Sequence, residues 1–434
     1  MKKTVAALLL AGVLLLSAGC KRTSAEPSSS PSPSPSPSAT LSVAAGESSQ
    51  QADVLAPDFI LGADVSSMLA LENAGVTFYG FDGQPQELTK ILQEAGFNYV
   101  RVRVWNDPYD AAGNGYGGGN CNVATAAEIG SRAALYGLKL LVDFHYSDFW
   151  ADPAKQQAPK AWENDSLEQK CAAITQFTQE SLAAIREAGA NIGMVQIGNE
   201  TTNGFCGEDD WASIPVLLKA GASAVRSFDP EIKIAVHFTN PENGRYGEFA
   251  RLLQQSAVDY DVFASSYYPY WHGTTETLKN ELSAVAAEYG KQVMVVETAW
   301  PYTLADTDAH PNAIGDGSFL QYDYPVSPEG QTAAITDVVR AISSIGESGI
   351  GVMYWEPAWI RVPAENATAR KALWELYGAG WASSYAASYD PTDAGVYYGG
   401  SACDNQALFD PNGYPLASLR TFANLRTASG HGKS

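Results

Sequence analysis

Two glutamates, Glu200 and Glu297, each stand at the end of a largely apolar run, at residues 194–198 and 293–296. A carboxylate so close to the core needs partners, because burying an unpaired charge is costly. Two facing carboxylates perform glycoside hydrolysis, in which one protonates the leaving oxygen and the other attacks or stabilises the anomeric carbon. Asn199 directly precedes Glu200, which favours this chemistry over two separate buried ion pairs.

Polar and aromatic residues also follow most of the other apolar runs. Acidic and histidine side chains at these positions are candidates for the wall of a binding site, or for hydrogen-bonded structural groups: Asp143, His145, Asp148 and His237. Tryptophan can pack its ring against the apolar face of a sugar, although it also fills protein cores. We expect Trp355 to form the floor under the cleaved sugar, and Trp150, Trp271, Trp300 and Trp359 are further candidates. The scattered histidines show no zinc-ligand spacing.

The glutamates must be positioned by the elements that precede them. Eight apolar runs predict strands, at residues 59–64, 98–105, 138–145, 192–198, 232–238, 260–267, 293–297 and 350–355. Apolar residues at helical spacing predict helices between them, at residues 85–94, 124–136, 168–187, 214–227, 248–255, 278–289 and 328–347. This alternation predicts an α/β fold, a (β/α)8 TIM barrel, in which the ends of the fourth and seventh strands can face each other across the mouth. A doubly wound open sheet is the competing fold, but no Gly-rich phosphate loop follows the first run.

Composition restricts the class of ligand. The chain has 434 residues and a formal net charge of −21, with 27 basic and 48 acidic residues. Nucleic-acid binding is therefore not expected, because it depends on Lys and Arg neutralising phosphates. A neutral ligand fits better.

The N-terminus predicts export and a tether. Residues 1–20 combine a basic start, an apolar run too short to span a bilayer, and Cys20 after small residues, which resembles a bacterial lipoprotein signal. The alternative is an ordinary cleaved signal with an incidental cysteine. Residues 21–56 are rich in Ser and Pro and predict a disordered linker, so the catalytic domain is expected at residues 57–430. We expect an extracytoplasmic protein, secreted or held at the cell surface by its lipid.

The order Asn199-Glu200 at the fourth strand end and Glu297 at the seventh resembles the clan A retaining glycoside hydrolases. Within that clan the chain is similar to the arabinogalactan endo-β-1,4-galactanases, glycoside hydrolase family 53, over about residues 57–425. The similarity is carried by the segments 62–66, 101–107, 143–150, 196–201, 264–273 and 354–359.

The resemblance implies roles for both carboxyl groups. Glu200 would be the general acid/base and Glu297 the nucleophile of a double displacement through a glycosyl–enzyme intermediate. Retention requires the two carboxyl groups to lie about 5–5.5 Å apart. The charge of Glu297, together with partial burial, would raise the pKa of Glu200 toward neutrality.

The resemblance also implies partners for the reacting groups. Arg103, with Tyr268 or its neighbour Tyr267, would keep Glu297 ionised, and Asn199 would hold the sugar 2-hydroxyl. The implied substrate is β-1,4-galactan, cleaved internally by a monomer that touches a membrane only through its N-terminal lipid. Two alternatives stay open: a related endo-glycanase for mannan, xylan or β-glucan, and a non-catalytic surface lipoprotein that captures oligosaccharides.

Oxygen-bearing side chains alternate from Asp306 to Asn312, a pattern by which loops wrap Ca²⁺. The bacterial family members resemble this stretch and bind calcium there, which implies a ligand set of Asp308, His310, Asn312, Ser401 and Asp404. The alternative is an acidic, solvated loop.

Four cysteines remain after Cys20: Cys121, Cys171, Cys206 and Cys403. Four cysteines in an exported domain allow three disulfide connectivities, and the sequence does not choose among them. A Cys206–Cys403 pair would clamp the loop after Glu200 to the expected calcium segment.

Overall fold

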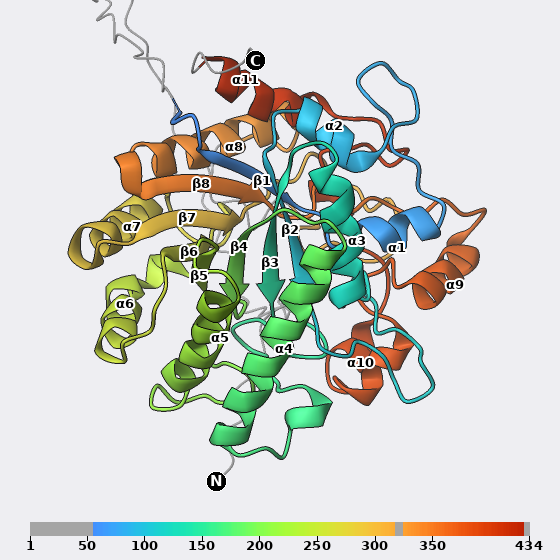
Figure 1. Cartoon of the computed structure of the whole chain (residues 1–434). Coiled ribbons are helices and arrows are strands. Elements are labelled where there is room, and N and C mark those ends of the chain that lie inside the picture. Colours follow the sequence, from blue (N-terminus) through green and yellow to red (C-terminus); the bar gives the residue numbers. More distant parts are fainter. Residues whose placement is uncertain (1–54, 317–323, 429–434) are drawn as a thin grey trace, which may run out of the picture. The chain divides into compact units, whose positions relative to one another are not determined.

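In the computed structural model, the eight apolar runs form parallel strands that close into one barrel in chain order (Figure 1). The structure describes residues 55–316 and 324–428. The strands are β1 (Ile60–Asp64), β2 (Tyr99–Val104), β3 (Lys139–Phe144), β4 (Ile192–Ile197), β5 (Lys233–Phe238), β6 (Val262–Ser266), β7 (Gln292–Glu297) and β8 (Gly349–Tyr354). The predicted (β/α)8 barrel is confirmed, with strand boundaries that differ by at most two residues.

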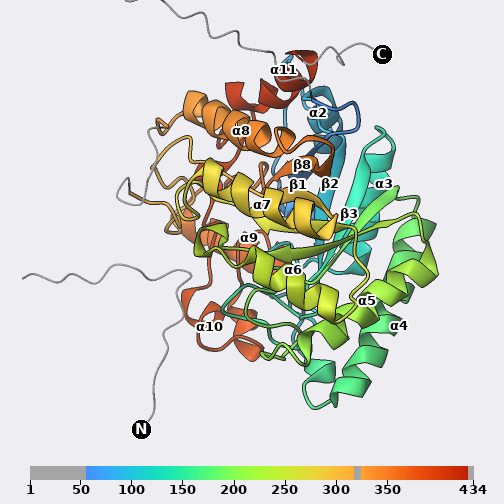
Figure 2. The ribbon, with the colours of Figure 1, turned by 90° about the vertical axis from the view of Figure 1, so that its left-hand side faces the viewer.

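Helices surround the barrel (Figures 1 and 2), and the longer ones bury apolar residues on one face. The predicted helices are present as α2 (Leu88–Glu94), α3 (Val123–Ala134), α4 (Leu167–Glu187), α5 (Ile214–Phe228), α6 (Tyr246–Gln255), α7 (Thr275–Tyr289) and α8 (Pro328–Ser343). The sequence pattern did not predict α1 (Met68–Asn73), α9 (Ala367–Tyr377), α10 (Ala394–Tyr397) and α11 (Thr421–Ala428). α1, α10 and α11 are short, so their hydrophobic period is too brief to distinguish them from loops. α9 is longer, but its buried residues are Arg370 and Trp374, so it has no clear apolar stripe.

The inward-facing side chains change from apolar to polar along the strands. One end of the barrel interior is filled by a separate apolar cluster: Ile60, Tyr99, Leu141, Met194, Ala235, Val262, Ala264, Met294, Val296 and Met353. Because side chains on a strand alternate with period two, the next inward positions are also fixed by the sequence. Toward the carboxyl ends these positions carry buried polar groups: Asp64, Arg101, Arg103, Asp143, Gln196, His237 and Ser266.

A register irregularity places Glu297 in this polar layer. Ser265 of β6 pairs with Val295, but the next residue, Ser266, pairs with Glu297, so β7 has one extra residue. A bulge of this kind re-aims the side chain that follows it. Val296 faces the apolar interior, and the bulge allows Glu297, directly after it, to reach the barrel mouth as well.

The N-terminal predictions fall mostly outside the described residues. The expected signal at residues 1–20 and all but the last two residues of the linker at 21–56 belong there. Of the expected catalytic domain at 57–430, residues 57–316 and 324–428 are described, and they contain the barrel. Among the helices that are described, none combines the length and apolar character needed to cross a membrane.

The four cysteines of the described part of the chain are free thiols. The Cys206–Cys403 pair, one of the connectivities that the sequence left open, is therefore not formed. Cys403 lies beside Ser401, with Sγ 3.4 Å from the serine Oγ. Burial raises the pKa of Cys206 to about 12 and that of Cys403 well above its ordinary value, so both stay protonated.

Candidate active site

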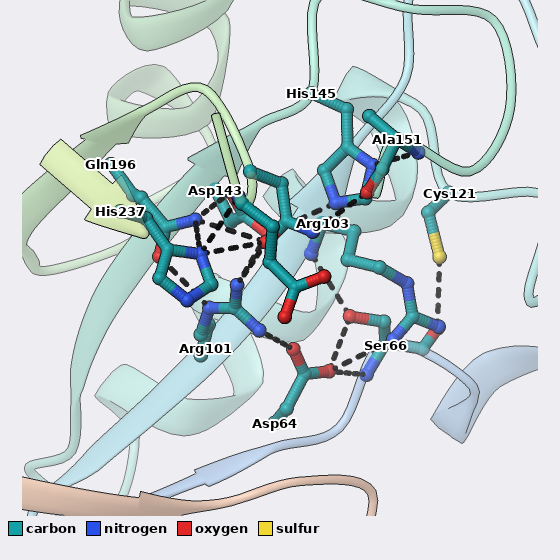
Figure 3. A network of polar contacts seen from close by, with 12 residues as sticks. Asp64, Ser66, Arg101, Arg103, Cys121, Asp143, His145, Ala151, Gln196 and His237 are labelled. Carbon is teal, nitrogen blue, oxygen red and sulfur yellow. Dashed lines mark hydrogen bonds and ion pairs between the residues drawn. The ribbon is translucent and has the colours of Figure 1, made fainter. Parts of the chain in front are cut away.

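Arg101 lies at the centre of the polar layer, fully buried. Its Nη1 is 2.8 Å from Asp64 Oδ2, and its Nη2 is 2.8 Å from Asp143 Oδ2 and 2.9 Å from Glu297 Oε1. The Nε atom donates to Gln196 Oε1 at 3.2 Å (Figure 3). One guanidinium thus neutralises part of the charge of three buried carboxylates, which is the condition for burying them at all.

Arg103 pairs with Glu356 and Asp64 rather than with Glu297, which corrects the prediction that Arg103 keeps Glu297 ionised. Its Nη2 is 2.8 Å from Glu356 Oε1, and its Nη1 is 3.3 Å from Asp64 Oδ1. The two arginines share one strand face, but only Arg101 reaches the nucleophile. Figure 3 shows Asp64 between the two guanidinium groups.

Glu297 is buried and receives two strong donors. Besides Arg101, the phenol of Tyr268 donates to Oε2 at 3.0 Å, as expected for this tyrosine. Burial raises the pKa of Glu297 above its ordinary value, and the Arg101 guanidinium acts against that rise. The pKa of Tyr268 is raised well above 10 by burial and by the charge of Glu297, so the phenol keeps its proton and stays a donor.

Glu200 follows β4 with a backbone φ of 46°, in the left-handed region. Its backbone N–H donates to His237 Nδ1 at 3.2 Å, and its carboxyl group bonds the side chains of Ser266 and Thr239. The pKa of Glu200 is raised to about 8, first by burial and then by the charge of Glu297. The expected shift is present, but burial is its larger cause.

The two glutamates share an environment. The charges of both Glu200 and Glu297 raise the pKa of Tyr268. Ser266, whose side chain bonds the carboxyl of Glu200, is the strand partner of Glu297. The structure therefore brings the predicted catalytic pair together at one end of the barrel.

Asn199 and His237 support this pair. Asn199 Oδ1 accepts from Arg101 Nη2 at 2.8 Å, and its Nδ2 donates to the carbonyl of Ala151 at 2.8 Å. The ring of His237 accepts from the Glu200 backbone at Nδ1, which leaves its Nε2 proton for Ser266 Oγ at 2.9 Å. Burial holds the pKa of His237 well below 6.5, so the ring is neutral.

Three of the expected wall residues form hydrogen bonds with other groups of the protein. Asp143 Oδ1 accepts from Gln196 at 2.6 Å, and its Oδ2 lies 3.1 Å from His145 Nε2. The Nδ1 atom of His145 accepts from the Trp105 indole at 3.0 Å. Asp148 accepts the backbone N–H groups of Asp107 and Lys160 at 2.9 and 2.7 Å, so it fixes a loop. All three are buried, and they support the residues of the site from the layer beneath it.

The aromatic candidates differ in exposure. Trp271 is 38% exposed and packs edge-on to Tyr268, with ring centroids 5.6 Å apart. Trp150 and Trp355 are partly exposed, at 6.4 Å from each other. By contrast, Trp300 and Trp359 are buried. The first three can therefore offer a surface to a ligand, whereas the last two fill the core.

Sequence reasoning assigned no role to several members of this network: Asp64, Arg101, Gln196, Ser266 and Glu356. Their positions in the sequence nevertheless indicate that they need partners. Each stands in, or within two residues of, a strand that is otherwise mostly apolar, where an unpaired polar group would be costly.

A second polar cluster joins the loops after β7 and β8. Carboxylate oxygens of Asp306, Asp308 and Asp404 lie within 4.8 Å of one another. Burial and the charge of Asp404 raise the pKa of Asp308 to about 7. Within the described residues, Asp404 Oδ1 and Asn312 Oδ1 are buried without a hydrogen-bond partner.

The remaining expected ligands lie around this cluster. The backbone N–H groups of His310 and Ser401 donate to Asp308 at 2.8 and 2.7 Å. The ring of His310 packs near Trp381, with centroids 6.5 Å apart, and burial lowers its pKa. Asp306 joins the cluster although the expected ligand set omitted it. Closely spaced carboxylates with unsatisfied oxygens fit a hard divalent cation.

The arrangement at the barrel mouth is suited to acid–base chemistry with a nucleophile. Glu200 holds a proton at neutral pH, and Glu297 has the cation and the phenol that stabilise an ionised carboxylate. A bond between two sugars placed here would meet a proton donor and a nucleophile together.

Comparisons with known proteins agree with this geometry. The family model for glycosyl hydrolase family 53 matches residues 60–422. The endo-beta-1,4-galactanase of Bacillus subtilis (strain 168) is 57% identical over 377 residues, covering 86% of this chain and 87% of that protein. The arabinogalactan endo-beta-1,4-galactanase of Cellvibrio japonicus is 32% identical over 331 residues, covering 73% and 85%.

Two solved structures are also similar to this chain. The GH53 catalytic domain of Ignisphaera aggregans superposes with a TM-score of 0.76 at 38% identity, covering 85% of this chain and 96% of that one. A fungal beta-1,4-galactanase structure superposes with a TM-score of 0.65 at 31% identity, covering 84% and 98%. The chain belongs to glycosyl hydrolase family 53.

Proposed function

We propose that this chain is an endo-β-1,4-galactanase that cleaves the galactan of type I arabinogalactan with retention of anomeric configuration. The observation that carries the chemistry is the pair of glutamates, with the pKa of Glu200 at about 8 and Glu297 bonded to Arg101 and Tyr268. The substrate class rests on the relatives, of which the Bacillus subtilis galactanase is 57% identical.

In the first step, Glu297 attacks the anomeric carbon while Glu200 gives its proton to the leaving oxygen. The attack turns the Glu297 carboxylate into a neutral ester. Because the charge of Glu297 raises the pKa of Glu200, its loss lowers that pKa. Glu200 is then a base of suitable strength to take a proton from the water that releases the sugar.

Asn199 has the position to hold the sugar 2-hydroxyl. Its oxygen bonds the same Arg101 nitrogen that bonds Glu297, so the amide lies beside the proposed nucleophile. A contact to the 2-hydroxyl strengthens as positive charge develops on the sugar.

The substrate is tested by measuring reducing ends released from linear β-1,4-galactan, mannan, xylan and β-glucan. Release from galactan alone supports the proposal, whereas preference for another polymer selects the related endo-glycanase. Proton NMR of the first product tests retention: we expect the β-anomer, and an α-anomer rejects the double displacement.

The two glutamate roles are separated by chemical rescue. Glu200→Ala and Glu297→Ala should each cut turnover by about 10² to 10⁴-fold or more while keeping the fold. With azide, Glu200→Ala should form the β-galactosyl azide and Glu297→Ala the α-galactosyl azide. Glu347→Ala, an exposed glutamate, is the control and should keep full activity. Unchanged turnover in either catalytic variant would reject the assigned roles. A parent without turnover, whose oligosaccharide uptake is unchanged in both variants, would support the non-catalytic surface lipoprotein instead.

We also propose a structural Ca²⁺ in the acidic cluster after β7 and β8. Asp306, Asp308 and Asp404 supply carboxylates, and Asn312 supplies a buried amide oxygen without a partner among the described residues. His310 and Ser401 complete the surroundings of Asp308. A bound cation there would tie two catalytic-face loops together.

Finally, we propose that the barrel is exported and anchored through a lipid on Cys20, acting as a monomer. The support is the signal-like start and the Ser/Pro-rich linker of the sequence. Cys20→Ala should release the protein from the membrane fraction into the medium. An unchanged distribution would indicate an ordinary secreted protein.

A further inference from the structure

Glu356 is a buried acid that the proposed chemistry does not use. It is 1% exposed and follows β8 with a backbone φ of 48°, in the left-handed region that glutamate seldom adopts. Its Oε2 accepts from Ser67 Oγ at 2.6 Å, and its Oε1 lies 2.8 Å from Arg103 Nη2. A strained backbone is kept only where surrounding contacts enforce it, and such positions gather at functional sites.

Arg103 connects this acid to a group of tryptophans. The guanidinium carbon lies 4.5 Å from the ring centre of Trp150, and 5.9 Å from those of Trp105 and Trp359. Trp150 and Trp359 stack at 6.3 Å with an interplanar angle of 19°. A cation over the face of an indole is attracted by the ring, so the location of Arg103 helps to fix that of Trp150.

Trp355 is connected to the same acid through the backbone. It directly precedes Glu356, and its N–H donates to the carbonyl of Thr298 after β7 at 2.9 Å. Its ring lies 6.4 Å from Trp150 and 6.1 Å from Trp359. Trp150 and Trp355 are the partly exposed members of this group, so they present its surface to the barrel mouth.

We propose that Glu356 is a positioning residue that acts through Arg103 to orient Trp150 and Trp355 as a stacking wall for galactosyl units beside the cleavage point. This rests on the proposed galactanase function and extends it to a residue that touches no substrate. Without the Glu356 charge, the nearest remaining anion of Arg103 is Asp64, at 3.3 Å. The guanidinium would then shift toward Asp64 and away from Trp150. The rings of Trp150 and Trp355 would no longer be held in one orientation.

The first experiment measures binding without turnover. In a Glu297→Gln background, the dissociation constant of β-1,4-galactotetraose is compared by calorimetry with and without Glu356→Gln. We expect binding to weaken by about tenfold, the scale of a lost aromatic contact. Glu72→Gln is the matched control, because Glu72 also pairs with an arginine, at 2.7 Å from Arg132, but on the outside of the barrel.

The second experiment distinguishes a lost orientation of Trp150 from a general destabilisation of the fold. Trp150→Phe should weaken binding by itself, and the Glu356→Gln/Trp150→Phe double variant should be no weaker than the worse single variant. Ser67→Ala removes one bond to Glu356 and gives a milder variant if Glu356→Gln folds poorly. Kinetically, Glu356→Gln should raise KM about tenfold, with most of the loss in KM and little in kcat.

The outcomes are distinguishable. If Glu297→Gln alone fails to bind the tetrasaccharide, the proposed substrate is wrong. If it binds and Glu356→Gln binds equally, or if the effects of Glu356→Gln and Trp150→Phe are additive, the positioning role is wrong. A loss confined to kcat would likewise overturn it.

Discussion

The Nη2 atom of Arg101 lies 2.9 Å from Oε1 of Glu297, at the carboxyl end of the barrel. The same nitrogen is 2.8 Å from Asn199 Oδ1 and 2.8 Å from Asp143 Oδ2. It has two hydrogens for three acceptors, so its bonds can be redistributed as the charge on Glu297 changes. A nucleophile that becomes an ester and then a carboxylate again requires a partner of this kind.

The Arg101→Met variant should lose both activity and stability. Removing this cation leaves three carboxylates buried without their shared partner, a change that costs about 3–5 kcal/mol for a buried pair. Arg132→Met, which breaks partly exposed ion pairs, is the comparison and should cost about 1 kcal/mol or less. Thermal unfolding of both variants checks this, and equal losses would contradict it.

Activity should fall at alkaline pH with an apparent pKa near 8. Glu200 must be protonated to act as the acid, and its pKa of about 8 sets the upper limb of kcat/KM. The lower limb reports ionisation of Glu297, whose pKa is raised above the ordinary value. A pH–rate profile on galactan measures both limbs. Full activity persisting at pH 10 would show that Glu200 is not the acid.

The Glu200→Gln variant should be inactive but more stable than the parent near pH 8. The folded-state pKa of about 8 exceeds the ordinary value of 4.5, so the folded parent binds the extra proton between those pH values. Its stability therefore falls as pH rises through this window, a loss that glutamine does not share. We expect a Tm difference of about 2 °C or more at pH 8 that shrinks toward pH 5. A constant difference would contradict this account.

Chelation should lower the melting temperature. A ligand at 100 times its Kd stabilises the folded state by about 2.7 kcal/mol, so removing Ca²⁺ should be measurable by calorimetry. Asp308→Asn and Asp404→Asn should each abolish the response to added Ca²⁺. Glu168→Gln, an acid in the first turn of α4, should leave it intact. A parent that melts identically with and without chelator has no such site.

The Asn199→Ala variant should lose kcat/KM by about 10² to 10³-fold, the scale of one transition-state donor. An oligosaccharide lacking the 2-hydroxyl on the cleaved sugar tests the reason. With that substrate, Asn199→Ala and the parent should be nearly equal. A variant still equally impaired would place the role of Asn199 in supporting Arg101.

The strands and the catalytic pair were predictable because both follow from local pattern. Each apolar run ends at the barrel mouth, so Glu200 and Glu297 were placed by counting strands. The partner of Glu297 was not predictable in the same way. Arg101 and Arg103 lie on one face of β2, roughly 6–7 Å apart along the strand. Which of them meets β7 depends on the tilt of the strands and on the bulge before Glu297, and neither is visible in the pattern.

For a related reason, the sequence left two roles open for the expected wall residues. Asp143, His145 and His237 occupy inward positions, as a contact to sugar requires, but inward positions also form the layer beneath the site. The sequence shows which way a side chain points and not how deep it lies. The cluster of Asp306, Asp308 and Asp404 combines segments about 100 residues apart, so only the fold could assemble its complete set.

The left-handed backbone at Glu200 and at Glu356 has a consequence for protein engineering. Asparagine and glycine adopt this conformation more readily than glutamate does. Directed evolution for heat resistance alone would therefore enrich substitutions at Glu200 and produce sturdier but inactive catalysts, whereas at Glu356 the loss of the Arg103 ion pair opposes that gain. A library screened for thermal tolerance should keep both codons fixed.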